Sequence, residues 1–340
     1  MNPRDRVFQA LDHLETDICP YYIWVHDEMI APLAEHYGNP DFKEGTIVDH
    51  SVMREVTASQ TAPAPGVFRD EFGCLWKQGA ALHLEQPALR RPSLSGYSMP
   101  DLTTPEHFDG LQLWLDRYSD RFRIVQLGIL FFERAWCLRG FEQFFMDMIE
   151  HPAFAGELLD ELAANCLAVI DRLLADFGDD IEAVGFSDDF GSERSLLVSP
   201  ALWRELIAPR LERMYARIRR GGKKVYLHSC GHVEPILPDL VELGVDMLQP
   251  LQPEANDIFR IKEEYGSRLC LVGGISTQRT LPFGTPDEVR REVARCLDVM
   301  ARGGGYIMAP AKPILPGVPL ENAVALIDAM TRQDGVRAAS

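Results

Sequence analysis

The sequence contains no apolar run long enough to cross a membrane as a helix. Its longest apolar stretches, such as residues 127–132, fall far short of the roughly 20 residues that such a helix requires. The charged start, Met1-Asn2-Pro3-Arg4-Asp5-Arg6, is not followed by the apolar core of a secretory signal. The seven cysteines are odd in number and irregularly spaced, which indicates reduced thiols rather than a disulfide framework. We therefore expect a soluble, cytoplasmic protein.

Basic residues are also scarce. The chain has 34 lysines and arginines against 51 aspartates and glutamates, so its formal net charge is −17. The sequence contains no block of clustered basic residues. A strongly acidic chain of this kind is a poor candidate for binding nucleic acid or an anionic membrane surface. The same charge disfavours a polyanionic substrate unless arginines gather locally.

The motifs of nucleotide binding and of serine hydrolases are missing. The glycine cluster Gly303-Gly304-Gly305 leads into a predicted strand, whereas a phosphate-binding loop needs a helix N-terminus after its glycines. No Gly-x-Ser-x-Gly sequence occurs either. We therefore expect neither nucleotide binding nor serine-hydrolase activity.

Strands and helices are predicted to alternate along the 340 residues, of which 46% are hydrophobic. Predicted strands cover 21–25, 122–130, 183–188, the run ending at His228, 245–248, 270–274 and 306–309. Predicted helices cover 4–14, 28–37, 41–46, 140–150, 153–177, 200–220, 233–243, 256–265, 285–302 and 319–331. Sustained alternation favours an α/β fold of the (β/α)8 TIM-barrel class, with an open doubly wound sheet as the alternative.

One stretch does not follow this alternation. Residues 61–86 combine proline-rich loop chemistry with a turn and a short strand, which predicts a β-hairpin or meander inserted near the N-terminus. We expect a single domain over residues 1–340, with a proline-punctuated connector at 92–105 and a frayed tail at 333–340.

A histidine and a cysteine stand two positions apart where one strand ends. Side chains at i and i+2 of a strand share a face, so His228 and Cys230 point the same way. Gly231 allows the chain to curl after them. Imidazole and thiolate are common zinc ligands. The alternative is a core histidine beside a buried free thiol.

Other polar residues follow the remaining predicted strands. If the fold is a barrel, they collect at one mouth, where such folds keep their chemistry. Each also has a structural interpretation as a cap, a backbone partner or a solvated charge. The set is His26, Asp188, Asp189, Gln249, Gln252 and Lys312.

Several segments, in their order and spacing, match the pattern of a known family. They are Pro3-Arg4-Asp5-Arg6-Val7, Phe132-Glu133-Arg134-Ala135-Trp136, Leu138-Arg139-Gly140-Phe141-Glu142, Asp188-Asp189-Phe190-Gly191, His228-Ser229-Cys230-Gly231, Gly273-Gly274-Ile275, Thr277-Gln278, Leu281-Pro282-Phe283-Gly284-Thr285-Pro286, Gly303-Gly304-Gly305-Tyr306-Ile307 and Val318-Pro319-Leu320-Glu321-Asn322. In these segments the chain resembles the uroporphyrinogen decarboxylase superfamily, and within it the corrinoid-dependent methyltransferases of O-demethylase type. The family fold is a (β/α)8 barrel.

The resemblance implies transfer of a methyl group between a small methylated substrate, such as a methoxylated aromatic, and the cobamide of a separate corrinoid protein. It implies zinc on His228 and Cys230. Thiol-methylating members carry a further cysteine ligand after the last strand, where this chain has Ala309-Pro310-Ala311-Lys312. The third ligand is therefore open, with Asp188, Glu193 and His26 as candidates.

The remaining roles are expected from the chemistry of the residues at the predicted strand ends, and for Trp24 from its aromatic ring, which core packing would explain equally well. Asp188 is expected to protonate the leaving group if zinc does not activate it. The residues expected to bind substrate are Trp24, His26, Asp189, Gln249, Gln252 and Lys312. The expected partners are the small-molecule methyl donor or acceptor and the corrinoid protein, with a homodimer left open and neither nucleic acid nor membrane.

Two other functions compete with this hypothesis. True uroporphyrinogen decarboxylases carry an arginine-rich segment after the first strand, where this chain has the acidic Trp24-Val25-His26-Asp27-Glu28. Burying substrate carboxylates there would be costly. A barrel that binds a ligand without turning it over is the second alternative.

Overall fold

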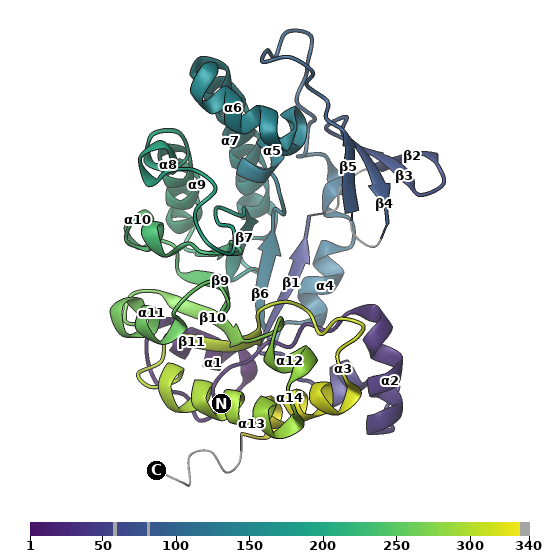
Figure 1. Ribbon diagram of the computed structural model, residues 1–340, viewed down its shortest axis with the longest axis vertical. Coiled ribbons are helices and arrows are strands. Elements are labelled where there is room, and N and C mark those ends of the chain that lie inside the picture. The colour runs from purple at the N-terminus through teal and green to yellow at the C-terminus, as the bar shows by residue number, and fades with distance from the viewer. Residues whose placement is uncertain (57–59, 80–81, 334–340) are drawn as a thin grey trace.

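The computed structural model describes residues 1–56, 60–79 and 82–333, and its centre is a curled parallel sheet (Figure 1). Within these residues the sheet has seven strands, in the order β1-β6-β7-β8-β9-β10-β11. Their bounds are β1 Ser51–Glu55, β6 Phe122–Gln126, β7 Ala183–Ser187, β8 Lys224–His228, β9 Met247–Leu251, β10 Cys270–Ile275 and β11 Tyr306–Pro310.

An extended segment at residues 20–25 occupies the remaining position in the ring. Tyr21 pairs in parallel with Met308 of β11, and Val25 pairs with Ile314. On its other side, the backbone N–H of His50, just before β1, donates to the carbonyl of Tyr21 at 3.0 Å. The predicted barrel class is thus confirmed, with isolated bridges where the sequence predicts a regular strand at 21–25.

Helices follow most strands, as the periodicity predicts. Their bounds are α1 Pro3–Leu11, α2 Asp27–Tyr37, α3 Phe42–Gly45, α4 Leu111–Arg117, α5 Phe132–Arg139, α6 Phe141–Glu150, α7 Pro152–Phe177, α8 Pro200–Leu206, α9 Ala208–Arg220, α10 Leu237–Leu243, α11 Ile258–Tyr265, α12 Thr280–Phe283, α13 Pro286–Met300 and α14 Leu320–Arg332. The predicted helix 200–220 divides into α8 and α9 at Ile207, because Pro209 has no N–H to continue the hydrogen-bond ladder. No helix in the described ranges is both long and apolar enough to span a membrane.

The predicted insertion is a four-stranded antiparallel meander beside α5 (Figure 1). Its strands are β2 Gln60–Ala64, β3 Val67–Asp70, β4 Leu75–Gln78 and β5 Leu82–Gln86. Asp70 ties it to the barrel, since its Oδ2 accepts from Arg134 Nη1 of α5 at 2.7 Å and from Trp76 Nε1 at 2.9 Å. Phe72 and Trp76 belong to the same apolar cluster as the helices around the sheet.

Helix α1 closes the amino-terminal end of the barrel. Val7, Ala10 and Leu11 pack into the barrel interior against Phe122, Ile124 and residues from the other strands. The carbonyl of Ala10 accepts from the N–H of Gly305, immediately before β11. With this end sealed, the carboxyl ends of the strands form the accessible mouth, as in other barrels.

His50 is buried where the chain enters β1. Its Nδ1 accepts from the backbone N–H of Tyr21 at 3.2 Å, and its ring lies 4.5 Å from the ring of Tyr21. Burial, with the nearby charges of Arg6 and Arg121, lowers the pKa of His50 to about 3. The folded protein therefore holds this imidazole neutral at the junction that closes the barrel.

We expect the free energy of unfolding to fall as the pH drops below about 6.5, where the unfolded chain begins to protonate His50. In the folded protein His50 is protonated only near pH 3. The stabilisation from neutral His50 is therefore fully present above about pH 6.5. It is lost as the pH falls toward 3, by about 1.4 kcal/mol of unfolding free energy per pH unit. Urea unfolding across this range should give a flatter pH dependence for His50→Asn, whose amide oxygen can replace the Nδ1 acceptor. Equal slopes in the two proteins would contradict this.

Candidate metal centre

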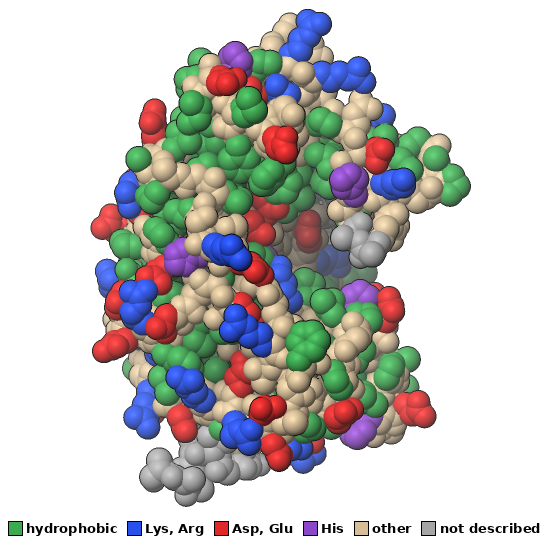
Figure 2. All heavy atoms as spheres, in the orientation of Figure 1, with side chains coloured by type: hydrophobic (Ala, Val, Ile, Leu, Met, Phe, Trp, Pro, Cys, Tyr) green, Lys and Arg blue, Asp and Glu red, His purple; other side chains and the backbone are tan. Residues whose placement is uncertain are grey.

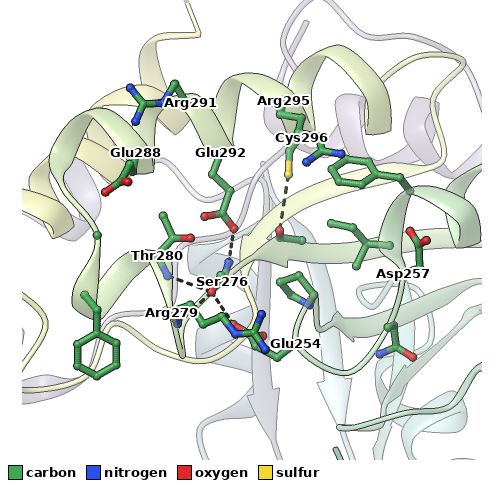
Figure 3. A pocket seen from close by; sticks show the side chains of 17 residues that line it. Glu254, Asp257, Ser276, Arg279, Thr280, Glu288, Arg291, Glu292, Arg295 and Cys296 are labelled. Atoms are coloured by element: carbon green, nitrogen blue, oxygen red, sulfur yellow. Dashed lines mark hydrogen bonds between the residues drawn. The ribbon is translucent and has the colours of Figure 1, made fainter. Parts of the chain in front are cut away.

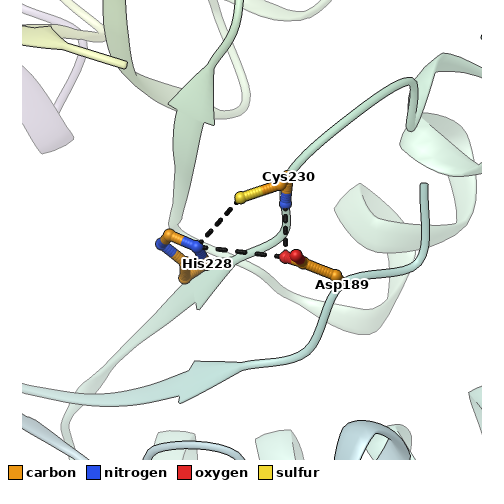
Figure 4. A group of neighbouring side chains, drawn as sticks. All are labelled: Asp189, His228 and Cys230. Atoms are coloured by element: carbon orange, nitrogen blue, oxygen red, sulfur yellow. Dashed lines mark hydrogen bonds and ion pairs between the residues drawn. The ribbon is translucent and has the colours of Figure 1, made fainter. Parts of the chain in front are cut away.

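Three side chains converge at the carboxyl ends of β7 and β8 (Figure 4). One ligand atom from each of Asp189, His228 and Cys230 lies within 4.8 Å of the others. His228 Nε2 is 3.1 Å from Cys230 Sγ and 3.9 Å from Asp189 Oδ1. The backbone N–H of Cys230 donates to the same Asp189 oxygen at 2.7 Å. Carboxylate, imidazole and thiol thus face one point.

A glycine allows this convergence. Gly231 has a φ of 81°, and a Cβ there would lie 2.5 Å from the carbonyl oxygen of Ser192. Any other residue would push the loops after β7 and β8 apart. The predicted curl after Cys230 is confirmed, and it brings Asp189 of one loop onto the residues of the next.

The ring of His228 is fixed from behind by Gln249 of β9. Its Nδ1 meets Gln249 Oε1, and an amide oxygen can only accept, so Nδ1 carries the proton. Nε2 then presents its lone pair toward Cys230 and Asp189. Metal-binding histidines have this arrangement, in which the second ring nitrogen is held by a carbonyl or carboxylate.

Lys312 adds a cation to the group. It follows β11, and its Nζ donates to Cys230 Sγ at 2.8 Å. Burial favours the neutral amine, but Cys230, Asp189 and Glu133 outweigh it and raise the pKa of Lys312. An ammonium group therefore stands beside the thiol.

The ring and the thiol are both neutral in the protein by itself. Burial lowers the pKa of His228 despite the opposing charge of Asp189. Burial and Asp189 together raise the pKa of Cys230 to about 12. A neutral imidazole is the form that binds metal, and a coordinating metal ion deprotonates a thiol outright.

Behind Asp189 lie two further carboxyl groups. Asp188 is fully buried, and its Oδ1 accepts from the N–H of Glu133 in the first turn of α5 at 2.9 Å. Glu133 Oε1 accepts from the N–H of Asp189 at 2.9 Å. Burial, then the charge of Asp189, raises the pKa of Glu133 to about 7. These reciprocal bonds hold the Asp189 loop against α5.

The sequence model of one protein family, described as uroporphyrinogen decarboxylase (URO-D), matches residues 133–333. The match covers more than half of the chain, from Glu133 through the metal-centre residues to Lys312 and beyond. The chain belongs to the URO-D family.

Proteins similar in sequence to this chain include methyltransferases. The methylcobamide:CoM methyltransferase MtaA of Methanosarcina barkeri is 34% identical over 133 residues, which are 39% of this chain and 37% of that enzyme. The methylated-thiol–coenzyme M methyltransferase of Methanosarcina mazei is 24% identical over 264 residues, covering 74% of this chain and 67% of that enzyme.

Among solved structures, a methyltransferase from Methanosarcina mazei superimposes with a TM-score of 0.71 at 19% identity. It covers 98% of this chain and 99% of its own. At 19% identity this similarity shows that the two chains share a fold.

In this URO-D family member the geometry differs from the expected roles at two positions. Asp189, expected to bind substrate, lies with His228 and Cys230 in the group that could hold a metal ion. Asp188 and the exposed Glu193 are not in that group. Asp188 has no exposed surface, and its Oδ1 accepts from the first turn of α5. Adjacent residues leaving a strand face opposite sides, which is why only one of the two aspartates can join the centre.

The other predicted residues lie in three places. Gln249 and Lys312 contact the centre directly, and Gln252 Oε1 accepts from the N–H of Gly231 at 3.2 Å. Trp24 lines a different cleft of about 300 Å³, whose lining includes no residue of the centre. His26 begins α2, where its Nδ1 accepts from the N–H of Glu28 at 3.3 Å.

Glu133 is not among the site residues predicted from the sequence. The segment Phe132-Glu133-Arg134-Ala135-Trp136 carries the family resemblance, and this was the available signal. Glu133 does not follow a strand immediately, so a search of strand ends passes over it.

The three ligand atoms suit zinc. Zinc takes carboxylate oxygen, imidazole nitrogen and thiolate sulfur, and catalytic sites keep three protein ligands with one position open. Asp189, His228 and Cys230 supply one atom of each kind. Gln249 provides the outer partner that such a histidine requires.

Proposed function

We propose that this protein is a corrinoid-dependent methyltransferase, which moves a methyl group between a small substrate and the cobamide of a separate corrinoid protein. The observation that carries the proposal is the convergence of Asp189, His228 and Cys230 at the open mouth. The names of the two Methanosarcina relatives support the reaction class.

In this proposal Asp189, His228 and Cys230 hold zinc. Zinc bound there would supply a Lewis acid that activates the oxygen or sulfur of the small substrate. Gln249 keeps Nε2 of His228 free to bind the metal. Lys312 Nζ donates to Cys230 Sγ and offsets the negative charge of a thiolate at that position. Helix α1 closes the opposite end of the barrel, so substrate and corrinoid protein would approach the same mouth.

For the substrate we propose a methyl group bound to oxygen, as in a methoxylated aromatic. In the family that the chain resembles, thiol-methylating members carry a cysteine after the last strand, where this chain has Ala309-Pro310-Ala311-Lys312. The ammonium of Lys312 can pair with an oxygen that leaves as phenolate. The reduced cobalt of the separate corrinoid protein would supply the electron pair that accepts the methyl group, and the substrate oxygen would keep the bonding pair and leave as phenolate. Trp24 lies in its own cleft and gives this proposal no support.

The direct test mixes the purified protein with reduced corrinoid protein and a panel of methoxylated aromatics, and with methylated corrinoid protein and either coenzyme M or phenols. Methyl transfer is followed by the absorbance of the methylated cobamide. Transfer in either panel supports the reaction, and transfer with the aromatic panel supports the oxygen-bound substrate. Absence of transfer in both panels would refute the proposal.

Decarboxylation of a porphyrinogen is the second candidate, because the family takes its name from that activity. A substrate with many carboxylates needs several cationic partners. Arg134, next to Glu133, is bound to Asp70, and residues 26–28 are His-Asp-Glu. Carbon dioxide released from a porphyrinogen, without methyl transfer, would favour this activity instead.

Replacing Lys312 by methionine is expected to slow methyl transfer from an aryl ether about 10- to 100-fold, the value of one charge-assisted hydrogen bond. Metal content should stay at the wild-type level, because Lys312 is not a ligand. Activity assays and metal analysis of the same preparations check both expectations. Lys77→Met, at an exposed position of the meander, is the matched control. An unchanged rate in Lys312→Met would remove Lys312 from the mechanism.

A further inference from the structure

A second cleft, of about 910 Å³, lies between α11 and α13 on the helix side of β10 (Figure 3). Its walls come from the loop between β9 and α11, the end of β10, α12 and one face of α13. None of Asp189, His228, Cys230 and Lys312 lines it. The cleft is therefore separate from the metal centre, and its size suits a small organic molecule.

The floor of the cleft is built on Ser276, just after β10. Its Oγ donates to Glu254 Oε1, and its backbone N–H donates to Glu292 Oε1 at 2.7 Å, so two carboxylates gather on one residue. Burial, together with the charge of Glu254, raises the pKa of Glu292.

The second oxygen of each carboxylate is unused. Oε2 of Glu254 and Oε2 of Glu292 are both shielded from solvent, and neither has a hydrogen-bond partner within the described residues. Asn256, a buried residue of the same lining, also has an unpartnered side-chain oxygen in this part of the chain. Buried acceptors without donors are costly, so this floor suits a ligand that donates several hydrogen bonds and carries positive charge.

The rim has the opposite charge. Arg279, Arg291 and Arg295 line the cleft, are exposed, and form no ion pair with any carboxylate in the described ranges. The guanidinium of Arg295 lies 4.0 Å above the ring of Phe259, which fixes its position. Guanidinium groups that have no ion-pair partner can bind a carboxylate or a similar anion.

The spacing on α13 explains how both charges reach one cleft. Glu288, Arg291, Glu292 and Arg295 are separated by three and four residues and so share a helix face. On an ordinary solvated face such residues would pair with one another. Arg290, which lies outside the cleft lining, does pair with Asp287 at 2.6 Å. Of the residues facing the cleft, Glu288 is bound to Thr285 in the cap of α13, whereas Arg291 and Arg295 keep their guanidinium groups available to a ligand.

We propose that this cleft binds a small zwitterion, an amino acid in the broad sense. Its ammonium group donates to Oε2 of Glu254 and of Glu292, and its carboxylate pairs with Arg291 and Arg295 at the rim. A bare metal cation would leave the guanidiniums without counter-ions. A simple anion would face two glutamates. A molecule with both charges satisfies the floor and the rim together.

Isothermal titration calorimetry with glycine, β-alanine and 4-aminobutanoate tests this, because the three differ in the span between their charges. At least one is expected to bind, and butylammonium and butanoate are expected to bind at least about tenfold more weakly, since each lacks one charged contact. Arg291→Gln should weaken zwitterion binding about tenfold or more. Arg290→Gln, on the same helix but paired with Asp287, should leave it unchanged.

Glu292→Gln tests the floor, and circular dichroism must first show that this variant is folded, since Glu292 accepts from the backbone of Ser276. Arg291 is exposed, so its variant tests the rim independently of folding. No binding of any of the three zwitterions would overturn the proposal. So would butylammonium binding as tightly as the zwitterions, or binding of Mg²⁺ or Ca²⁺ in their place. The readout is binding alone and does not depend on methyl transfer.

Discussion

Replacing Cys230 by alanine is expected to remove the metal from the protein. The wild type should hold about one zinc ion per chain, as three-ligand sites do, and Cys230→Ala only a small fraction of that. The variant loses a ligand and leaves the ammonium of Lys312 beside the vacated position, which repels a cation. Methyl transfer should fall by more than ~100-fold, since loss of even an outer partner of a ligand costs 10- to 100-fold. Metal analysis after purification without chelators, together with the transfer assay, measures both effects.

His228→Ala should behave in the same way, because it removes the imidazole between the other two ligand atoms. Cys166→Ala is the matched control. Its thiol is buried, donates to the carbonyl of Leu130 at 3.6 Å and does not belong to the group. The metal centre would be refuted by a wild type that takes up no stoichiometric zinc, or by Cys230→Ala holding as much as the wild type.

Replacing Asp70 by alanine is expected to lower the free energy of unfolding by about 3–5 kcal/mol, as when one partner of a buried ion pair is removed. Asp70 and Arg134 are both buried, with Nη1 and Oδ2 2.7 Å apart. The change also leaves the N–H groups of Cys74 and Trp76 without their acceptor. Urea unfolding measures the loss. Asp70→Asn keeps the shape and removes the charge, so its cost should be smaller.

Asp239→Ala is the control for this prediction. Arg204 and Asp239 form a two-bond pair at 2.7 and 2.9 Å, but the Arg204 side chain is 51% exposed. Such a pair contributes about 1 kcal/mol or less. A cost for Asp70→Ala as small as that of Asp239→Ala would show that the meander is not held to α5 by this contact.

The residues at the strand ends show which parts of the candidate site can be predicted from the sequence. His228 and Cys230 are two apart, and the period of a strand places such residues on one face whatever surrounds them. Lys312, Gln249 and Gln252 follow or end strands that the apolar runs reveal. Their collection at one mouth follows from parallel strands in a barrel, so this part of the centre was predictable.

Other elements gave no such signal. Strand β1, Ser51–Glu55, was not predicted, because its residues are mostly half-buried and it ends in two charged residues without a clear apolar alternation. The meander was predicted because prolines, a glycine and a turn interrupt the chain there. Its attachment through Asp70 and Arg134 joins residues 64 positions apart, which no local pattern reveals.

Most of the alternation of strands and helices, the barrel class and the pair His228 and Cys230 follow from the sequence alone, since each rests on a short-range period. The choice of Asp189 over Asp188, the cation beside Cys230 and the charged cleft along α13 were decided by the tertiary structure. Each depends on which way a side chain turns once distant segments pack together. That direction is set by burial and by partners elsewhere in the chain, so it exists only in the folded protein.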